Sequence, residues 1–498
     1  MSRQILTTQI VAATLLTGPC LLLPASALAQ SAAAKPALTG VAFNAKFEDI
    51  QYKAAVYVDD GKFVAEKSGR GEVSGGNVTG NSATGLKIVV RDDQTNGLYV
   101  RGKSDFTLTN SSIEVFGNSA GWDENFGIGA GATVGFGATL TLRNVTVTTA
   151  GLKAVPVAGA GGILRVYDSK LVAKGGELQP ENRSPDSGPG YFGPPVPLNI
   201  SGTARGSNVI GDGKAYYYNS TIIADGWGAM STDSATPAVY LEINDCRVIV
   251  NNSGYGAYAD LRSEVVANNT HFSSASDTGI ISGNGKITLN NVTEDRAVNG
   301  VLLHAPGQDF LSVGTLNIRG GSYKTKEATI LVKSHNANIV LDNVKLQPKN
   351  GVLLQSEVND SKRSPLIIWL LNERKAANVT TTPAAGINTT FKNIAKLSGD
   401  IVHKDTTRTM TLNLEQTSLK GAITGTVWAI NDISLKLDGG SSWTATRDSR
   451  VTLLGLTDTK QIDAPRGVTI IAIAGKGTTL EGHYKLAHGG ELIVKKAS

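Results

Sequence analysis

A short pattern recurs along this sequence about every two dozen residues, and it constrains the fold more than any other feature. Alternating apolar residues lead to an Asn, Asp, Gly or, once, Gln, and two residues later another apolar residue follows, as in LTLRNVTV at Asn144. The same position recurs at Asn110, Asp168, Asn219, Asp245, Asn269, Gly320, Asn343, Gln416 and Gly440. The chain advances 24 residues from Asn144 to Asp168 and 24 from Asp245 to Asn269. A period of this length is typical of a solenoid, in which each repeat adds one coil.

Two longer intervals interrupt the repeat. The interval from Asp168 to Asn219 is 51 residues and that from Asn343 to Gln416 is 73, close to two and three periods. A second mark, Gly followed by apolar residues, lies between the first marks, as in GWGA at Gly226. Each period is therefore predicted to hold at least two short strands joined by tight turns.

The small residue at the turn has a physical reason. Asn, Asp and Gly tolerate the left-handed backbone that a sharp corner requires. Neighbouring coils stack about 4.8 Å apart, so Asn side chains can hydrogen-bond along the stack. The composition agrees, because the 498 residues include 57 Gly, only 6% are aromatic, and no long helix-forming runs are evident. The sequence therefore predicts an all-β chain of strands and turns.

These coils resemble those of right-handed parallel β-helix proteins of the pectate-lyase-like group, over about residues 85–440. The resemblance implies a single right-handed parallel β-helix (solenoid) and leaves the activity open, because this scaffold hosts lyases, hydrolases, epimerases and adhesins. The segment 434–456, SLKLDGGSSWTATRDSRVTLLGL, is similar to the last coils of autotransporter passenger domains, and 482–496 is expected to close the helix. No outer-membrane strand pattern follows it, so the similarity to autotransporters covers the passenger alone and implies no self-anchoring.

The first 29 residues are predicted to be a secretory signal peptide of bacterial type. Arg3 precedes an apolar run and the small-residue pattern Ala27-Leu28-Ala29. We therefore expect a secreted or periplasmic protein. The further predicted parts are an N-terminal segment and cap (30–85), a parallel β-helix (86–456) with an inserted loop (175–214), and C-terminal closing coils (457–498).

Charge and motif content limit the classes of partner. The formal net charge of +5 is too weak and dispersed to indicate nucleic-acid binding. No apolar run after the signal peptide is long enough to cross a membrane. Cys246 is the single cysteine after residue 29, so we expect a buried, unpaired thiol and no intramolecular disulfide. We expect a monomer without a cofactor or metal motif, with calcium bound through scattered Asp and Glu as an alternative.

Polar residues at predicted strand ends suggest a catalytic edge. After each Gly mark the strand ends at Asp233, Asp260, Asn284 and His304, and farther on at Lys333, His335 and Glu357. If the register holds, Asp233 and Asp260 lie one coil apart, where two carboxylates would split their proton affinities and act as acid and base on a glycoside. Arg262 and His304 are candidates for stabilising charge beside them. The alternative is turn chemistry, because Asp and Asn commonly end strands.

Aromatic residues beside this edge suggest a substrate site. Trp227 and Tyr255 are expected at equivalent positions of neighbouring coils, with Tyr258 nearby. Facing outward they would form a platform for sugar rings, and facing inward they would stack in the core. The loop 175–214 is expected to form one wall of a groove, and its end, Asp212 and Lys214, leads into the coil of Trp227.

Two functions from different classes follow. The first is a secreted carbohydrate-active enzyme, a polysaccharide lyase, hydrolase or epimerase working in a lateral groove. The second is a non-catalytic surface protein, adhesin-like and built like an autotransporter passenger. Either would have a polysaccharide or cell-surface glycan as its partner.

Overall fold

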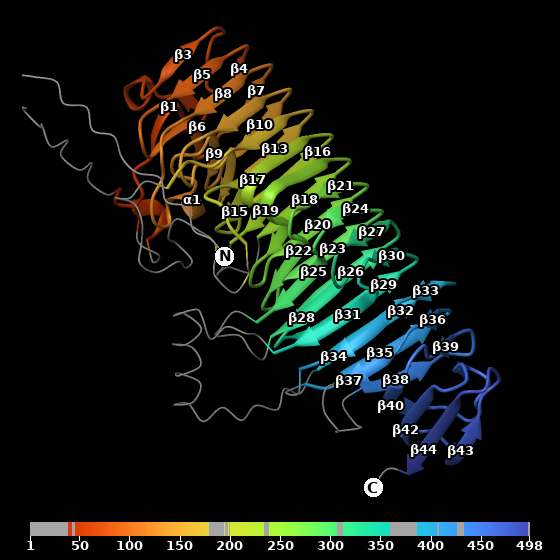
Figure 1. The fold of residues 1–498 in the computed structure, drawn as a ribbon. Coiled ribbons are helices and arrows are strands. Elements are labelled where there is room, and N and C mark those ends of the chain that lie inside the picture. The colour runs from red at the N-terminus through yellow and green to blue at the C-terminus, as the bar shows by residue number, and fades with distance from the viewer. Residues whose placement is uncertain are drawn as a thin grey trace, which may run out of the picture. The chain divides into compact units, whose positions relative to one another are not determined.

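The structure is a computed structural model that describes residues 38–41, 45–178, 194, 198, 200–233, 239–305, 312–358, 386–405, 408–425 and 433–496. The predicted signal peptide and much of the loop 175–214 lie outside these residues. Nearly all regular structure consists of strands, and nearly all strand pairs are parallel. This confirms the predicted all-β parallel β-helix (Figure 1).

Three series of parallel strands make the sides of the helix, and most described coils contribute one strand to each. Sheet I continues in an unbroken series of parallel pairs through the described chain. Its strands are β4 (Ser82–Thr84), β7 (Asp105–Thr109), β10 (Thr139–Arg143), β13 (Ile163–Tyr167), β16 (Lys214–Tyr218), β18 (Tyr240–Asn244), β20 (Glu264–Asn268), β23 (Lys286–Asn290), β26 (Val313–Arg319), β29 (Asn336–Asp342), β32 (Ile387–Lys392), β35 (Met410–Glu415), β38 (Ile433–Leu437), β40 (Ser449–Leu454), β42 (Thr469–Ala474) and β44 (Glu491–Lys496).

Sheet II follows sheet I in every coil, after the turn that carries the Asn or Asp. Its strands are β5 (Lys87–Val90), β8 (Ser112–Val115), β11 (Thr146–Thr149), β14 (Lys170–Ala173), the first parts of β17 (Thr221–Thr232) and β19 (Arg247–Ala259), β21 (His271–Ser273), β24 (Thr293–Ala297), β27 (Ser322–Thr325) and β30 (Lys345–Pro348). A separate four-stranded sheet stands at the same place in later coils, with β33 (Leu397–Ser398), β36 (Ser418–Lys420), β39 (Ser442–Thr444) and β41 (Ile462–Asp463).

Sheet III completes the described coils as far as β37, and it joins sheet II where β17 and β19 run through both. Its strands are β1 (Lys53–Asp59), β6 (Thr95–Arg101), β9 (Ala132–Gly135), β12 (Val157–Ala160), β15 (Arg205–Ile210), the second parts of β17 and β19, β22 (Asp277–Ser282), β25 (Asn299–His304), β28 (Ile330–Lys333), β31 (Val352–Glu357), β34 (Asp400–His403) and β37 (Ile423–Gly425). Because β1 pairs parallel with β6, coil stacking already includes part of the segment predicted as the cap.

The remaining elements are short. The strands β2 (Lys62–Phe63), β3 (Glu72–Ser74) and β43 (Gly482–Lys485) pair antiparallel with β1, β5 and β44. The helices are α1 (Asp123–Phe126), η1 (Phe47–Asp49) and η2 (Ala65–Lys67). No described helix has the length and apolar character that a membrane crossing requires.

The turn between sheets I and II explains the repeat. Left-handed backbone is found at Asn144 (φ 52°), Asp168 (φ 50°) and Asn219 (φ 48°), as the sequence predicts. The side chains also bond along the stack, because Asn144 Nδ2 donates to Asn110 Oδ1 at 2.7 Å and Asn219 Nδ2 donates to Asp168 Oδ1 at 2.6 Å. At these turns, the sheet I strand with alternating apolar residues therefore ends at an Asn or Asp. This residue turns the backbone and also continues the row of side-chain hydrogen bonds between neighbouring coils.

The interpretation of the long intervals as whole periods is wrong. Tyr167 pairs directly with Tyr218, so Asp168 and Asn219 belong to adjacent coils and the 51 residues between them are one coil with an insertion. The 73-residue interval holds one further coil, whose turn is Asn393 (φ 53°).

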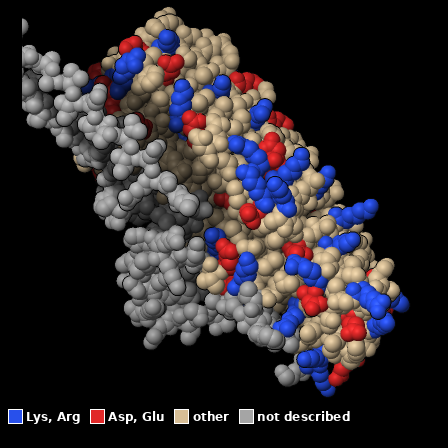
Figure 2. Space-filling view, viewed as in Figure 1, with Lys and Arg blue, Asp and Glu red and all other residues tan. Residues whose placement is uncertain are grey.

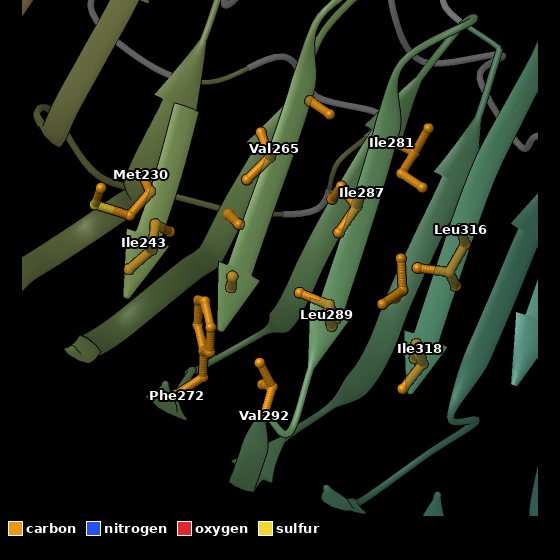
Figure 3. Close-up of a cluster of buried hydrophobic side chains, with 14 of the residues drawn as sticks. Met230, Ile243, Val265, Phe272, Ile281, Ile287, Leu289, Val292, Leu316 and Ile318 are labelled. Atoms are coloured by element: carbon orange, nitrogen blue, oxygen red, sulfur yellow. The ribbon is translucent and has the colours of Figure 1, made fainter. Parts of the chain in front are cut away.

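Apolar side chains from all three sheets fill the interior. The inner positions of sheet I, such as Ile243, Val265 and Leu289, are almost completely buried, while their neighbours along each strand face outward. Figure 3 shows these side chains with Met230 of β17 and Phe272 of β21 in one continuous core. Cys246 is part of this core, and burial raises the pKa of its thiol to about 11.

Candidate functional site

Charged side chains from successive coils converge beside Trp227. Glu124 comes from α1, Lys153 from the connection between β11 and β12, and Arg205 from the start of β15. Asp233 directly follows β17, the strand that holds Trp227. We call Glu124, Lys153, Arg205, Trp227 and Asp233 the Trp227 cluster. The first four lie at the corner where the chain passes from sheet II to sheet III, which is the least regular part of each coil.

Ion pairs connect the members of the Trp227 cluster. Glu124 Oε1 lies 3.2 Å from Lys153 Nζ and 3.3 Å from an Arg205 guanidinium nitrogen. Arg205 reaches Asp233 with its other terminal nitrogen, 2.6 Å from Oδ2. Both cations also lie against the Trp227 ring, with Lys153 Nζ 5.4 Å and Arg205 Cζ 5.3 Å from the ring centroid. These distances fit cation–π contacts on both basic groups.

Most of the charged side chains of the Trp227 cluster are buried, and burial changes their proton affinity and hydrogen bonding. The side chains of Lys153, Glu124 and Arg205 are 0%, 1% and 4% exposed, whereas that of Asp233 is 23% exposed. Removal from water lowers the pKa of Lys153, and the nearby Glu124 opposes this shift. Among the described residues, Glu124 Oε2 and Arg205 Nε have no hydrogen-bond partner. Unpaired buried polar atoms are costly, so they mark a place with a role other than stability.

The backbone of the Trp227 cluster is strained. Trp227 has φ 63° and Lys153 has φ 55°, and both therefore adopt the left-handed conformation that large side chains avoid. Strained backbone persists only where the surrounding structure enforces it, and it is found most often at functional sites. At Trp227 it coincides with an irregularity in the pairing of β17 with β19, between Ala224 and Gly226.

This irregularity corrects one sequence prediction. Trp227 pairs with Gly254, and Tyr255 pairs with Gly228, so the two aromatic residues are not at equivalent positions of their coils. One extra residue in β19, between Val250 and Ser253, shifts the register by one. The similar stretches DGWGAMSTD (225–233) and SGYGAYAD (253–260) are therefore offset by one residue in the strand pairing.

Neither predicted platform residue lies open to solvent. Trp227 is 5% and Tyr255 is 1% exposed, and they pack with Ile280, Leu302 and Leu331 in a cluster separate from the main core. The inner side of sheet III is occupied by neighbours such as Ile281 and Leu303, so this second cluster lies on the outer side of the sheet. Tyr255 donates to or accepts from Ser231 Oγ at 2.7 Å.

Tyr258 and Asp260 form the more open edge beside the Trp227 cluster. The Tyr258 ring centroid lies 5.2 Å from that of Tyr255, and the hydroxyl is 3.4 Å from Asp260 Oδ1. Both residues are half-buried. Ser231 pairs with Tyr258, and extending this register by two residues aligns Asp233 with Asp260 on adjacent coils. The predicted neighbourhood of Asp233 and Asp260 is thus compatible with the strand register.

The register also places the other polar residues of the predicted edge. Ser282 pairs with His304, His304 with Lys333 and Lys333 with Glu357. Ser282, not Asn284, therefore follows Asp260 in this series, and the Asn284 side chain instead accepts a hydrogen bond from the Arg262 backbone at 2.9 Å.

His304 lies two coils beyond Asp260 and is not brought beside the carboxylate pair. It is 7% exposed, and burial together with the nearby Lys333 lowers its pKa to about 4. A neutral imidazole is therefore expected at pH 7. His335 is fully buried, and burial lowers its pKa to about 3, with His304 and Arg408 adding to the effect.

Three further predicted site residues lie elsewhere. Asp212 is an exposed turn residue with φ 61° before β16. Lys214 and Arg262 line an open hollow of about 490 Å³ on the outer side of sheet I, together with Tyr216, Val239, Tyr240, Glu242 and Glu264. The structure thus divides the predicted site between sheet III, with Trp227, Asp233, Tyr255, Tyr258 and Asp260, and this hollow.

Glu124, Lys153 and Arg205 are the residues that sequence reasoning missed. Glu124 and Lys153 lie in irregular corners, where no repeat fixes which side chains meet. Arg205 lies just outside the conspicuous Gly and Asn marks. In the sequence, the one signal that could have indicated these residues is a charged side chain within a Gly-rich, apolar segment. Among the described residues, no group of three His, Cys, Asp or Glu side chains is arranged to hold a metal ion.

Comparison with known proteins adds no assignment. The sequence matches no protein-family model and no curated protein. The architecture defines the chain as a parallel β-helix protein.

Proposed function

We propose that this protein is a carbohydrate-active enzyme on a β-helix of the pectate-lyase-like kind, a polysaccharide lyase, hydrolase or epimerase. The observation that supports this most directly is a partly exposed carboxylate, Asp233, held by the buried cation Arg205 at the edge of a strained ion cluster. Perturbed and strained charged groups of this kind concentrate at catalytic sites. The predicted signal peptide is consistent with action outside the cytoplasm, where polysaccharides are accessible.

Asp233 and Asp260 are the proposed acid and base. Adjacent coils are about 4.8 Å apart, so the two carboxylates would act on one substrate from neighbouring coils. Arg205 supplies a fixed positive charge beside Asp233, and Glu124 with Lys153 holds that guanidinium in position. In this role Arg205 stabilises negative charge that develops as the reaction proceeds.

Substrate would enter over the half-buried Tyr258 and Asp260. Tyr258 would offer a ring to the sugar, while Trp227 and Tyr255 support the site from beneath, because both are buried. Arg262 lines the hollow on sheet I and is not part of this proposed site. A bound calcium ion is not required by this arrangement, and chelation tests it directly.

A panel of polysaccharides tests the proposal with two readouts, absorbance of unsaturated uronic ends and appearance of reducing ends, each with and without EDTA. The informative variant is Asp260→Asn, because Asp233→Asn also removes the partner of buried Arg205 and could unfold the site. Asp105→Asn, an exposed acid at the start of β7 in sheet I, is the matched control. Turnover lost in Asp260→Asn and kept in Asp105→Asn supports the proposal. Equal turnover in all three proteins would rule out the carboxylate pair.

A second candidate function is a non-catalytic, adhesin-like surface protein. One observation favours it: Trp227 and Tyr255 are buried, so the predicted sugar platform is not at the surface. In that case the Trp227 cluster would only fix the corner loops against sheet III. A folded protein without turnover on the whole panel would favour this function over the enzyme.

A further inference from the structure

The outer side of sheet I carries four tyrosines on adjacent strands. Alternation along β13 and β16 points Val166, Ala215 and Tyr217 inward, so the residues between them point outward. The outward tyrosines are Tyr167, Tyr216, Tyr218 and Tyr240, all half-buried, and we call them the tyrosine face. The tyrosine face belongs to a different sheet from the Trp227 cluster and overlaps the open hollow.

The rings of the tyrosine face are held in fixed positions. Tyr167 and Tyr218 pair in register and stack at 5.0 Å between centroids with an angle of 9° between planes. Arg143 covers the other side of Tyr167, with Cζ 4.2 Å from the ring centroid. On the next strand Asn244, and not an aromatic residue, takes the register position after Tyr218. Tyr216 and Tyr240 lie 5.8 Å apart at 50°.

Basic groups around the tyrosine face lack acidic partners. Arg143, Arg165, Lys214 and Arg262 form no ion pair with a described residue. The two acids of the hollow are already engaged. Glu264 pairs with Lys286 at 2.7 Å, and Glu242 accepts hydrogen bonds from Tyr240 (2.7 Å) and Asn244 (3.0 Å). Positive charge is therefore left over, and Figure 2 shows Lys and Arg gathered over the surface where Figure 1 labels β16 and β18.

We propose that the tyrosine face and its hollow bind an acidic polysaccharide, a polymer of sugars bearing spaced carboxylates. Ordered aromatic rings offer flat apolar surface for sugar rings at low entropic cost, because the sheet already fixes them. The unpaired guanidinium and ammonium groups match carboxylates on the polymer. Glu242 and Glu264 can accept hydrogen bonds from sugar hydroxyls.

The same two acids argue against a nucleic acid. A DNA strand such as oligo(dT) offers phosphate acceptors and almost no hydroxyl donors, so Glu242 and Glu264 in the hollow would repel it without a compensating hydrogen bond. A uronic-acid polymer carries hydroxyls beside its carboxylates, and these can donate to Glu242 and Glu264. This binding site is separate from the proposed catalytic site. The tyrosine face lies on sheet I, whereas Asp233 and Asp260 follow the sheet III parts of β17 and β19.

Binding of the purified protein to alginate, dextran and oligo(dT) tests this proposal, with isothermal titration at two salt concentrations. One variant removes rings (Tyr218→Ala/Tyr240→Ala), and another removes charge (Arg165→Gln/Lys214→Gln). Arg319→Gln, an exposed arginine on the outer side of β26, is the control. Circular dichroism confirms that each variant is folded.

We expect alginate binding that weakens with salt, and a loss of about tenfold or more in affinity for the ring and charge variants, with little change for the control. Unchanged affinity in both variants, or tighter binding of oligo(dT) or dextran than of alginate, would overturn the proposal. Asp260→Asn should bind alginate normally, so failure of the catalytic proposal and failure of this one are distinguishable.

Discussion

Lys153 and Glu124 form an ion pair, 3.2 Å between Nζ and Oε1, with both side chains almost completely removed from water. Such a pair contributes little net stability, because desolvation offsets the attraction. Removing one of the two groups is costly, since the other then loses an ion-pair partner inside the protein. The pair is therefore best understood as holding the corner loops in one arrangement under Trp227.

Glu124→Gln should be strongly destabilising. The change removes the Glu124 carboxylate from both Lys153 and Arg205, and breaking a buried pair in this way costs about 3–5 kcal/mol. The free energy of unfolding from guanidinium titration measures it. Lys286→Gln is the control, because its pair with Glu264 is 41% and 38% exposed and should matter by less than about 1 kcal/mol. Equal effects of the two changes would contradict the buried-pair argument.

Substitutions at Asn144 can separate two contributions of the turn to stability, that of the left-handed backbone and that of the side-chain hydrogen bond. Its φ of 52° disfavours most residues, and its side chain donates to Asn110. Asn144→Ala should lower the free energy of unfolding by about 1–2 kcal/mol for the left-handed backbone, plus about 0.5–1 kcal/mol for the hydrogen bond. Asn144→Gly should recover the backbone part. Thermal unfolding compares the two, and a Gly variant no more stable than the Ala variant would show that backbone strain is unimportant here.

The coil architecture could be predicted because its determinants are local. Alternation fixes which side faces the core, and the Asn or Asp turns need only their own left-handed backbone, as at Asp168 and Asn219. The insertion between them could not be counted correctly, because spacing alone does not distinguish an added coil from an added loop. Only the pairing of Tyr167 with Tyr218 decides this.

The candidate site was harder to predict because it depends on contacts between coils. The shift between Ala224 and Gly226 displaces Trp227 from Tyr255, and no alignment of Gly marks reveals a single extra residue in one strand. Lys153 and Glu124 meet through irregular corners, where the sequence carries no period. Asp233 and Asp260 were singled out correctly as strand-end residues, and their catalytic role stays a prediction.

His304→Gln should change how stability depends on pH. The folded pKa of about 4 lies below the ordinary value of 6.5, so the unfolded chain binds more protons between these values. The free energy of unfolding should therefore fall as the pH falls through this window, by up to about 1.4 kcal/mol per pH unit from this group. Relative to the wild type, the variant should gain stability from pH 6.5 to pH 4. Parallel curves for the two proteins in urea titrations would contradict this expectation.

Asp277→Asn should have the opposite effect. Burial raises the pKa of this carboxyl to about 7, and the folded protein therefore binds more protons than the unfolded chain between pH 4 and pH 7. The wild type loses stability from this group as the pH rises, whereas an amide does not titrate and can keep the contact with Asn299. The difference in unfolding free energy between variant and wild type should increase from pH 4 to pH 7. A constant difference would show that Asp277 keeps its ordinary pKa.

Cys246 should be unreactive in the folded protein. The side chain is buried and its pKa of about 11 leaves almost no thiolate at pH 8, and the thiolate is the reactive form. Labelling by iodoacetamide, followed by mass spectrometry, should be negligible in native buffer and complete in guanidinium. Rapid labelling of the native protein would mean that the coil opens locally at β19.

Because Asp168 and Asn219 stack as neighbours across 51 residues, the corner between sheets II and III can absorb a long stretch of chain without disturbing the coils on either side. Closing a longer loop costs only about 0.6 kcal/mol per doubling of its length. Elsewhere each coil meets the one made about two dozen residues earlier, so the contact order stays low however many coils are added. A chain of this kind can form coil by coil as it emerges, and its corners can acquire new segments while the stack keeps its register.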